Sequence, residues 1–285
     1  MKPQWLKIKL SRNDNFDSID NTLKKYNLHT VCQEAHCPNI SECWNGGTAT
    51  FMIMGDICTR GCRFCAVKTG RPLMLDKDES QKLAQAVKEW GLDYIVITSV
   101  DRDDLTDQGA NHFAACIVEV RKENPNTLIE VLVPDFRGDE ELIKIIIETK
   151  PDVFAHNIET VKRLQNVRDI RANYGQSLFV LKLAKQLGIK FTKSSLMLGL
   201  GETEQEVIEA MQDLRSIGAD IITFGQYLRP SNKHIQITEY VHPDKFEYYK
   251  KLAEDMGFLY CASGPFVRGS YRAGEFFLKG LMKGV

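Results

Sequence analysis

The feature that most constrains the fold of this 285-residue chain is a regular alternation of short β-branched runs with amphipathic segments. Six runs have the composition of buried strands: 48–55, 93–100, 128–134, 152–158, 190–199 and 220–228. Between them lie helical patterns such as 79–91 and 203–218, each closed by a glycine placed as a C-cap, and Thr203 and Glu206 have the spacing of a capping box. The alternation predicts parallel strands joined by crossover helices.

The fold class that follows is α/β, a partial (β/α)6 barrel of the TIM type with its chemistry at the carboxyl ends of the strands. A doubly wound open sheet fits the periodicity almost as well, and the strand pattern alone does not exclude it. We divide the chain into an N-terminal extension (1–47), the barrel (48–229) and a C-terminal extension (230–285). No Ser/Gly-rich linker separates them, so we expect both extensions to pack on the barrel as one body.

Composition argues against two classes of partner. Lys and Arg (37) balance Asp and Glu (38), and no block of like charge marks a surface for nucleic acid. No stretch reaches the roughly 18 to 20 uncharged apolar residues that span a membrane, and the N-terminus has no apolar signal-peptide core. We therefore expect a cytoplasmic protein that binds neither nucleic acid nor membrane.

Cysteine usage indicates metal or redox chemistry. The chain has eight cysteines, and six of them lie between Cys32 and Cys65. This number is too small for a disulfide scaffold in a chain of this length, and clustered thiols in a reducing compartment bind metals or carry redox reactions. Cys116 and Cys261 lie in apolar runs, where we expect small buried hydrophobes without a further role.

The second cysteine triplet follows the first predicted strand directly. Cys58, Cys62 and Cys65 form a C-x3-C-x2-C pattern on a predicted loop. A closed zinc site needs a fourth ligand and usually pairs two C-x2-C elements. A 4Fe-4S cluster also has four irons to ligate, and with three protein ligands one iron stays open to a small molecule.

With Phe64 just before its last cysteine, this triplet resembles the signature of the radical S-adenosylmethionine (SAM) superfamily. The resemblance implies a 4Fe-4S cluster whose open iron binds the amino and carboxylate groups of S-adenosylmethionine. It also implies a 5′-deoxyadenosyl radical that abstracts hydrogen from unactivated carbon. The superfamily's partial (β/α)6 barrel, with the cluster loop after the first strand, agrees with the six strand-helix units.

The first triplet, Cys32, Cys37 and Cys43, has C-x4-C-x5-C spacing. Taken alone, it also fits a structural zinc site with His36 or a distant residue as fourth ligand. The two triplets together resemble the lipoyl synthase family, in which the first holds an auxiliary 4Fe-4S cluster that supplies sulfur. Further stretches similar to that family run along the chain: ATFMIMGDICTRGCRFCAV, ITSVDRDDLTDQGA, VLVPDFRG, HNIETV, KSSLMLGLGET and GQYLRPS.

Residues 268–271, RGSY, are similar to the family's R-S-S-Y motif, in which a serine oxygen completes the auxiliary cluster. A hydroxyl oxygen is a harder ligand for iron than a thiolate, which suits an iron that must leave when the cluster gives up sulfide. The chain departs from the motif at Gly269, so the resemblance implies Ser270 as the ligand, with Ser263 as the fallback. Alternatively, Ser270 is the N-cap of a terminal helix.

A pocket for S-adenosylmethionine needs hydrogen bonds to the ribose and to the amino acid end, and strand termini should supply them. The candidates are Phe64, Thr98, Asp103, Asn157, Glu159 and Glu202, with Ser99 and the rest of 101–104 beside them. We expect His156 to be a packed histidine, because hydrogen abstraction by a carbon radical needs no general base. Ordinary surface charge is the favoured interpretation of Arg229 and Arg272, ahead of contact with a carrier protein.

The resemblance implies the following activity: two sulfur atoms are inserted at C6 and C8 of an octanoyl-lysine. The implied partners are an octanoylated lipoyl carrier domain (2-oxoacid dehydrogenase E2 or glycine cleavage H protein) and a ferredoxin- or flavodoxin-type electron donor. One rival is a two-cluster electron carrier, which would use four cysteines per cluster and need no barrel. The other is a radical methylthiotransferase, whose first triplet is more widely spread and which usually carries a C-terminal RNA-binding domain.

Overall fold

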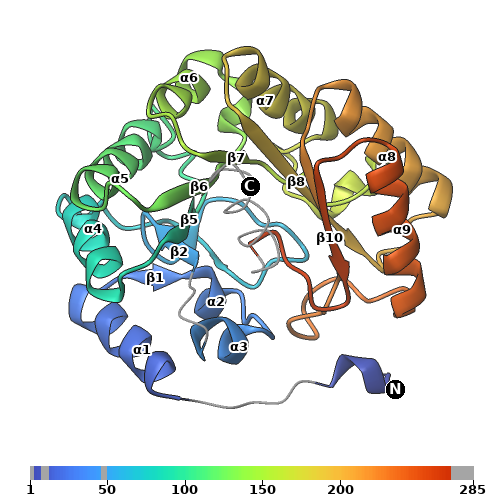
Figure 1. The fold of residues 1–285 in the computed structure, drawn as a ribbon, viewed down its shortest axis with the longest axis horizontal. Coiled ribbons are helices and arrows are strands. Elements are labelled where there is room, and N and C mark those ends of the chain that lie inside the picture. The colour runs from blue at the N-terminus through green and yellow to red at the C-terminus, as the bar shows by residue number, and fades with distance from the viewer. Residues whose placement is uncertain (1–2, 8–12, 46–49, 271–285) are drawn as a thin grey trace.

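A single curved sheet organises the molecule. The computed structural model describes residues 3–7, 13–45 and 50–270. Its main sheet has the strand order β1-β2-β5-β6-β7-β8-β9-β10, and helices cover its outer face (Figure 1). The two end strands do not pair with each other, so the sheet is an open barrel, which confirms the predicted fold class.

The strands of the main sheet are β1 (His29–Thr30), β2 (Thr50–Ile53), β5 (Tyr94–Ser99), β6 (Leu128–Leu132), β7 (Val153–Ala155), β8 (Phe191–Leu198), β9 (Ile221–Gln226) and β10 (Tyr260–Gly264). A separate parallel pair consists of β3 (Ile57–Cys58) and β4 (Lys68–Thr69). The six predicted strands correspond to β2 and β5–β9, which pair in parallel, as predicted, and follow one another in chain order.

The α-helices are α1 (Asp14–Tyr26), α2 (Val31–Glu34), α3 (Ile40–Asn45), α4 (Glu79–Trp90), α5 (Ala110–Glu123), α6 (Glu140–Glu148), α7 (Tyr174–Gln186), α8 (Glu204–Ser216) and α9 (Pro243–Asp255). Three 3-10 helices lie at η1 (Gln4–Leu6), η2 (Phe136–Gly138) and η3 (Lys162–Val167). The capping box of Thr203 and Glu206 begins α8, and Gly91 in the left-handed region ends α4, both as predicted.

Both extensions join the sheet. β10, in the C-terminal extension, pairs in parallel with β9 from Tyr260 opposite Ile221 to Gly264 opposite Gly225. β1, in the N-terminal extension, pairs antiparallel with β2. β10 is not among the six predicted strands, because five residues without clear alternation do not reveal a partner strand.

The interior of the barrel is filled at the amino ends of the strands. Tyr94, Val153, Phe191 and Ile221 form a buried cluster there, and beside it the ammonium group of Lys193 lies 2.7 Å from the carboxylate of Glu130. Side chains alternate along a strand, so Thr98 on β5 and Ser195 on β8 face the same interior nearer the carboxyl ends. Those two residues line a cavity, which is therefore confined to the carboxyl side.

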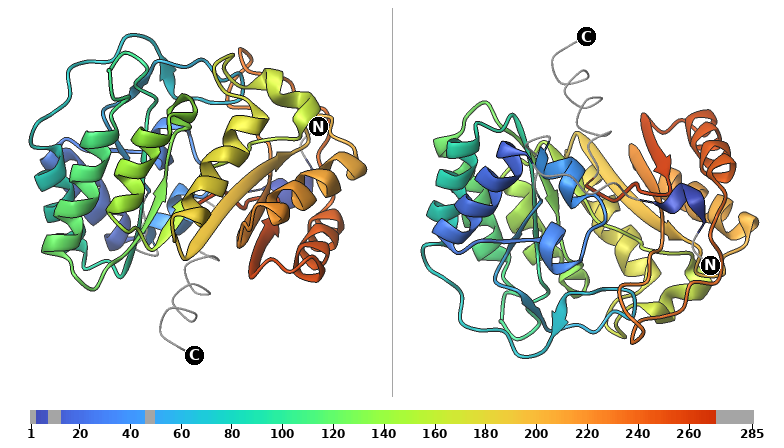
Figure 2. Two further views of the ribbon diagram at one scale, coloured as in Figure 1. Left: turned by 90° about the horizontal axis from the view of Figure 1, so that it is seen from above. Right: turned by 90° about the horizontal axis from the view of Figure 1, so that it is seen from below.

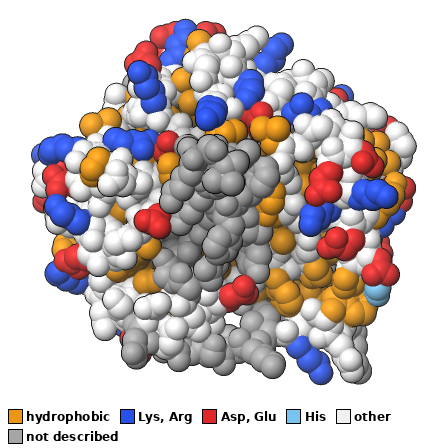
Figure 3. All heavy atoms as spheres, in the orientation of Figure 1, with side chains coloured by type: hydrophobic (Ala, Val, Ile, Leu, Met, Phe, Trp, Pro, Cys, Tyr) orange, Lys and Arg blue, Asp and Glu red, His pale blue; other side chains and the backbone are white. Residues whose placement is uncertain are grey.

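The outer surface shows no dominant charge on the face that Figure 3 displays. Acidic and basic side chains are interspersed around the rim of this face, in keeping with a formal net charge of −1 (Figure 3). In the described ranges, no helix combines the length and the apolar character that crossing a bilayer requires.

Candidate active site

The two cysteine triplets open onto one cavity at the carboxyl ends of the strands. The cavity has a volume of about 630 Å³, and its wall includes Cys32, Cys37, Cys58, Cys62 and Cys65. Cys43 does not line it and packs against the main hydrophobic core instead. Five of the six clustered cysteines, from both triplets, therefore lie on the wall of one cavity.

A buried arginine fixes the loop that carries the second triplet. Arg60, 5% exposed, lies between the first two cysteines of the loop. Its guanidinium donates to Asp103 at 2.9 Å and to Asp135 at 2.7 Å. These bonds fix the loop to the ends of β5 and β6, because Asp103 and Asp135 follow those strands.

Backbone amides already point at two of the sulfur atoms. Cys58 Sγ lies 3.4 Å from the backbone nitrogens of both Arg60 and Asp101. Cys62 Sγ lies 3.3 Å from the backbone nitrogen of Asp169. Amide donors of this kind stabilise a negative charge on sulfur, so the loop is arranged for thiolates.

The far end of the same loop is held by the connection between β9 and α9. His234 Nε2 lies 2.9 Å from the carbonyl oxygen of Cys65, and the backbone nitrogen of Ile235 donates to the carbonyl of Arg63 at 3.1 Å. The sequence around His234 carries no motif that would single it out. Only the three-dimensional contact reveals its part in the site.

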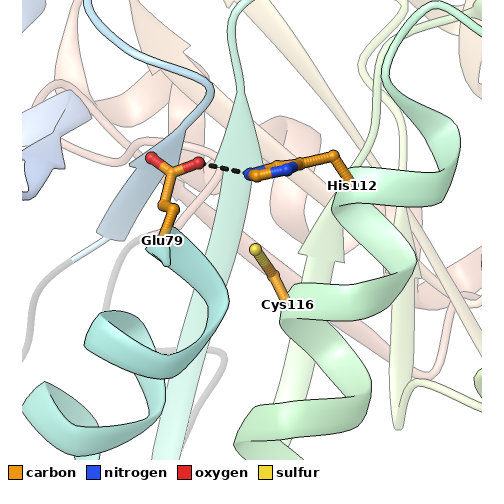
Figure 4. Close-up of side chains that lie close together, drawn as sticks. All are labelled: Glu79, His112 and Cys116. Atoms are coloured by element: carbon orange, nitrogen blue, oxygen red, sulfur yellow. Dashed lines mark hydrogen bonds and ion pairs between the residues drawn. The ribbon is translucent and has the colours of Figure 1, made fainter. Parts of the chain in front are cut away.

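The start of the loop is anchored by a buried carboxylate. Met54 has a φ of 69° and is followed by Gly55 with a φ of 91°, so the chain turns sharply after β2. Both oxygens of Glu79 lie close to the backbone nitrogen of Met54, at 2.9 and 3.1 Å, and His112 Nε2 lies 2.6 Å from Glu79 (Figure 4). Cys116, one turn further along α5, completes a compact group. Because its neighbours occupy both oxygens, we interpret Glu79 as the anchor of this turn.

Without a metal, burial keeps the cysteine side chains of the cavity as protonated thiols. Burial raises the pKa of Cys58 and of Cys62 to about 12, and of Cys65 and Cys32 to about 11. A thiol in such surroundings loses its proton when a metal takes its place. Among the described residues, neither triplet brings its three sulfur atoms as close together as the ligands of one metal ion.

The C-terminal segment lies against the first triplet. Asn39, between Cys37 and Cys43, donates to the carbonyl of Phe266 at 2.5 Å. Burial raises the pKa of Cys37, and the nearby positive charge of Arg268 opposes this rise. Ser270 lines the cavity beside Arg268 and Gly269, whereas Ser263 lies off the cavity wall and donates to the carbonyl of Phe246.

Two glycines next to the segment that carries Ser270 differ in the space around them: Gly269 has room for a Cβ atom, and Gly225 does not. A Cβ atom at Gly269 would lie 3.5 Å from the nearest atom of Asn157, an ordinary contact. A Cβ atom at Gly225 on β9 would lie 2.0 Å from the carbonyl oxygen of Val267. The segment that carries Ser270 can therefore cross the end of the sheet only where β9 has no side chain.

Four of the six candidate contacts for S-adenosylmethionine line the cavity: Phe64, Thr98, Asn157 and Glu159. Asp103 and Glu202 do not. Burial opposes ionisation of Asp103, yet hydrogen bonds from Arg60 and Arg137 hold the pKa of its carboxyl group below the usual range. Glu202 accepts hydrogen bonds from the backbone nitrogens of Gly199 and Leu200 at 2.5 and 2.9 Å. Both carboxylates are therefore already hydrogen-bonded to neighbouring residues of the protein.

The other histidines, cysteines and arginines singled out in the sequence lie in the core, on the cavity wall or outside the described residues. His156 is buried and bonded to the carbonyl of Val133 and to Ser177, and burial lowers its pKa to about 4, so it is the packed neutral histidine that was expected. Cys116 and Cys261 are buried, 0% and 2% exposed. Arg229 lines the cavity and donates to the carbonyl of His234, while Arg272 and the predicted terminal helix lie outside the described residues. His36 also lines the cavity.

Two family models match this chain. The model of the radical SAM superfamily matches residues 52–214, which hold the barrel strands β2 to β8 and the second cysteine triplet. The model of the N-terminal domain of lipoyl synthase matches residues 1–37, which include the first two cysteines of the first triplet.

The similarity to whole proteins extends over nearly the full chain. Lipoyl synthase of Halobacterium salinarum is 54% identical over 288 residues, covering 99% of this chain and 93% of the relative. Lipoyl synthase of Myxococcus xanthus is 55% identical, covering 99% and 95%. The mitochondrial lipoyl synthase of Schizosaccharomyces pombe is 54% identical, covering 99% and 78%.

Solved structures share the architecture at low sequence identity. Methylornithine synthase superposes with a TM-score of 0.54 at 14% identity, covering 81% of this chain and 64% of that one. Streptococcus suis SuiB bound to S-adenosylmethionine has a TM-score of 0.58 at 10% identity, covering 79% and 53%. At such identities the likeness bears on the fold alone.

Proposed function

This chain belongs to the lipoyl synthase family of the radical SAM superfamily, and from that premise we propose how its own residues divide the work of the reaction. The protein is a radical SAM sulfurtransferase that inserts two sulfur atoms, at C6 and C8, into a protein-bound octanoyl-lysine. Its cofactors are S-adenosylmethionine and 4Fe-4S clusters. The observation that carries the residue assignment is the single cavity that two cysteines of the first triplet and all three of the second line.

We assign Cys58, Cys62 and Cys65 to the cluster that binds S-adenosylmethionine. Once bound and reduced, that cluster supplies the electron that splits the sulfonium and so gives the 5′-deoxyadenosyl radical. The protein's part is to hold the loop from three sides, through Arg60, Glu79 and His234, and to offer amide donors to the sulfurs. Phe64, Thr98, Asn157 and Glu159 are our proposed contacts for S-adenosylmethionine, because all four line the cavity.

We assign Cys32, Cys37, Cys43 and Ser270 to the auxiliary cluster, the source of the inserted sulfur. Support comes from the Asn39–Phe266 hydrogen bond and from the proximity of Arg268 to Cys37, which bring the C-terminal segment to the first triplet. Ser270 faces the same cavity, whereas the hydroxyl of Ser263 is already bonded elsewhere. The boundaries 1–47, 48–229 and 230–285 thus mark contributions to one site rather than separable activities.

Substrates of this family are lipoyl domains. More narrowly, we propose octanoylated E2 or glycine cleavage H protein as carrier, and a ferredoxin- or flavodoxin-type protein as electron donor. Free thiols and iron-sulfur chemistry favour a reducing compartment, so we propose the cytoplasm.

The assignment is tested on anaerobically reconstituted protein with an octanoyl-lysine peptide, S-adenosylmethionine and reductant. Wild type should bind about eight irons per chain and form the dithiolated product. Cys37→Ala should bind about four irons and form 5′-deoxyadenosine without inserting sulfur. Cys261→Ala is the matched control, a buried cysteine outside both triplets, and should behave as wild type. Zinc in the first triplet, or no sulfur in the wild-type product, would refute the proposal.

A second comparison separates the two interpretations of Ser270. Asparagine caps a helix about as well as serine but offers iron only an amide oxygen. Under our assignment, Ser270→Asn should lose iron from the auxiliary site and stop sulfur insertion. If Ser270→Asn keeps full iron content and activity, Ser270 acts as an N-cap.

A further inference from the structure

An exposed basic and apolar surface covers the outside of the loop that carries Cys58, Cys62 and Cys65. We define this outer loop face by the exposed side chains of Arg63, Lys68, Arg71, Leu73, Met74, Lys162 and Ile170. Of the cations in segments 59–73 and 162–173, two are buried (Arg60 and Arg168) and three pair with carboxylates (Lys68, Arg163 and Arg171). The exposed cations Arg63, Arg71 and Lys162 remain, in a chain whose formal net charge is −1. Such a local excess of positive charge attracts an acidic partner.

The same surface holds the most exposed large apolar side chains of the described residues. Leu73, Met74 and Ile170 are 80%, 91% and 97% exposed. Leu73 and Met74 follow β4 in the chain, and Ile170 follows η3. In both views of Figure 2, β4 and η3 lie at the same end of the molecule. Apolar residues ringed by charge are typical of a protein interaction site.

Hydrogen bonds join the two segments into one surface. The backbone nitrogen of Gly61 donates to Asp169 at 2.8 Å, and the backbone nitrogen of Arg63 donates to the carbonyl of Val167 at 2.8 Å. Lys68 pairs with Asp56. For Arg63, Arg71 and Lys162, the described part of the chain supplies no ion-pair partner. Three cations on this surface are therefore available to a partner.

The outer loop face lies very close to the cluster ligands but outside the cavity. Ile170 follows Asp169, whose backbone nitrogen is 3.3 Å from Cys62 Sγ. None of the seven residues that define the face lines the cavity. A partner bound there would be one residue layer from the second triplet without obstructing the substrate chamber.

From these observations we infer that the outer loop face is the docking site of a small acidic one-electron carrier protein. This inference rests on the proposed ligand assignment. Two sulfur insertions need two reductive cleavages of S-adenosylmethionine, and the second occurs while the acyl chain occupies the cavity. One electron passes each time from the reduced carrier to the bound cluster, and the carrier leaves oxidised by one electron. An octanoylated lipoyl domain, in contrast, must reach the cavity itself.

The first test measures binding directly. The probes are a reduced ferredoxin and a reduced flavodoxin, titrated calorimetrically into the cluster-loaded protein. We expect Arg71→Glu combined with Lys162→Glu to weaken donor binding by about tenfold or more and to flatten its salt dependence, because charge steering is lost. Leu73→Ser combined with Ile170→Ser should weaken binding with little change in salt dependence. Lys251→Glu and Val118→Ser, exposed on α9 and α5, are the controls.

The second test separates the donor from the acyl carrier. Both double variants should raise the KM for the donor while the rate with dithionite and the KM for the octanoylated domain stay at wild-type values. Unchanged donor affinity in the double variants overturns the inference, whether or not the KM for the octanoylated domain rises. If wild type with dithionite yields no lipoyl product, the proposed function fails, whereas the donor-binding result stands separately.

Discussion

At the scale of single residues, substitutions at Gly225 on β9 and at Gly269 are predicted to have opposite outcomes. Gly225→Ala should be severely destabilising, by about 1–3 kcal/mol or more, because its Cβ would lie 2.0 Å from the carbonyl oxygen of Val267. Gly269→Ser should be tolerated, since its Cβ meets only ordinary contacts at 3.5 Å and beyond. Urea unfolding and iron content of the two variants measure this contrast. If both variants lose the same stability and iron, the segment that carries Ser270 does not cross the sheet next to Gly225.

His156 makes the stability of the protein depend on pH in a defined window. Burial lowers its folded pKa to about 4 from an ordinary value of 6.5, so the unfolded state takes up the proton first as pH falls. The stability that the protein has with His156 neutral is fully present above pH 6.5. It is lost as pH falls toward 4, by about 3 kcal/mol in the free energy of unfolding.

The measurement is the free energy of unfolding of the apoprotein in urea at pH 7, 5.5 and 4. His156→Gln should reduce the loss of stability over this range, whatever its stability at pH 7. The exposed His242→Gln should leave the pH slope unchanged. Acidic groups with shifted pKa values are common to all three proteins and cancel in the comparison. Identical slopes for wild type and His156→Gln would contradict the expectation.

A site residue can be predicted from sequence when the pattern that marks it lies within a few neighbouring residues. The cysteines could be proposed as ligands from the sequence because the members of each triplet lie within a few residues of one another, and that assignment stays a prediction. Arg60, Glu79 and His234 were not predicted, because each acts through a partner distant in sequence: Asp135, Met54 and Cys65. Asp103 and Glu202 were suggested by their position near strand ends, yet neighbouring donors use their oxygens.

At the scale of elements, the amino end of α4 controls the turn that leads into the second triplet. Glu79→Ala should leave the backbone nitrogen of Met54 without its acceptor, at a cost of about 1–3 kcal/mol. A loosened turn should also lower the iron bound by Cys58, Cys62 and Cys65. Glu79→Gln should retain more of both, because an amide oxygen still accepts a hydrogen bond. Iron per chain and thermal unfolding are the readouts, with the exposed Glu148→Ala on α6 as control.

A metal ion held by Glu79, His112 and Cys116 would give a different result. In that case Cys116→Ala would be as harmful as Glu79→Ala, whereas the hydrogen-bonded anchor needs no sulfur. Iron content at the wild-type level in Glu79→Ala would exclude control of the cluster loop by this turn.

Strand prediction succeeded where strands are buried on both faces and failed at the sheet edges. β2, β5, β6, β7 and β9 consist mainly of apolar residues, which the sequence displays directly. β8 is buried along almost its whole length although its residues 192–195 are polar. β1 is two residues long, and β10 is five residues long with intermediate burial at three of them. Such edge strands owe their conformation to one neighbour, so their own sequence carries little of the signal.

At the scale of the whole molecule, the three predicted segments share one core. Phe16, Ile19 and Trp44 from the N-terminal extension and Phe246 and Tyr249 from the C-terminal extension belong to the same hydrophobic cluster as the barrel. The absence of a linker in the sequence predicted this packing. The cavity requires it, because its wall combines residues from all three segments, such as Cys37, Thr98 and Ser270.

The barrel segment 48–229 alone is therefore not expected to fold. Without 230–285, β9 loses β10 and becomes an exposed edge, and without 1–47, β2 loses β1. Removing Trp44 and Phe246, each 1% exposed, would also uncover apolar surface that a single layer of helices does not protect. The fragment should show no cooperative urea transition, while the full chain shows one. If the fragment unfolds cooperatively and binds about four irons, the extensions are additions to an autonomous domain, and the auxiliary site is assembled on a finished barrel.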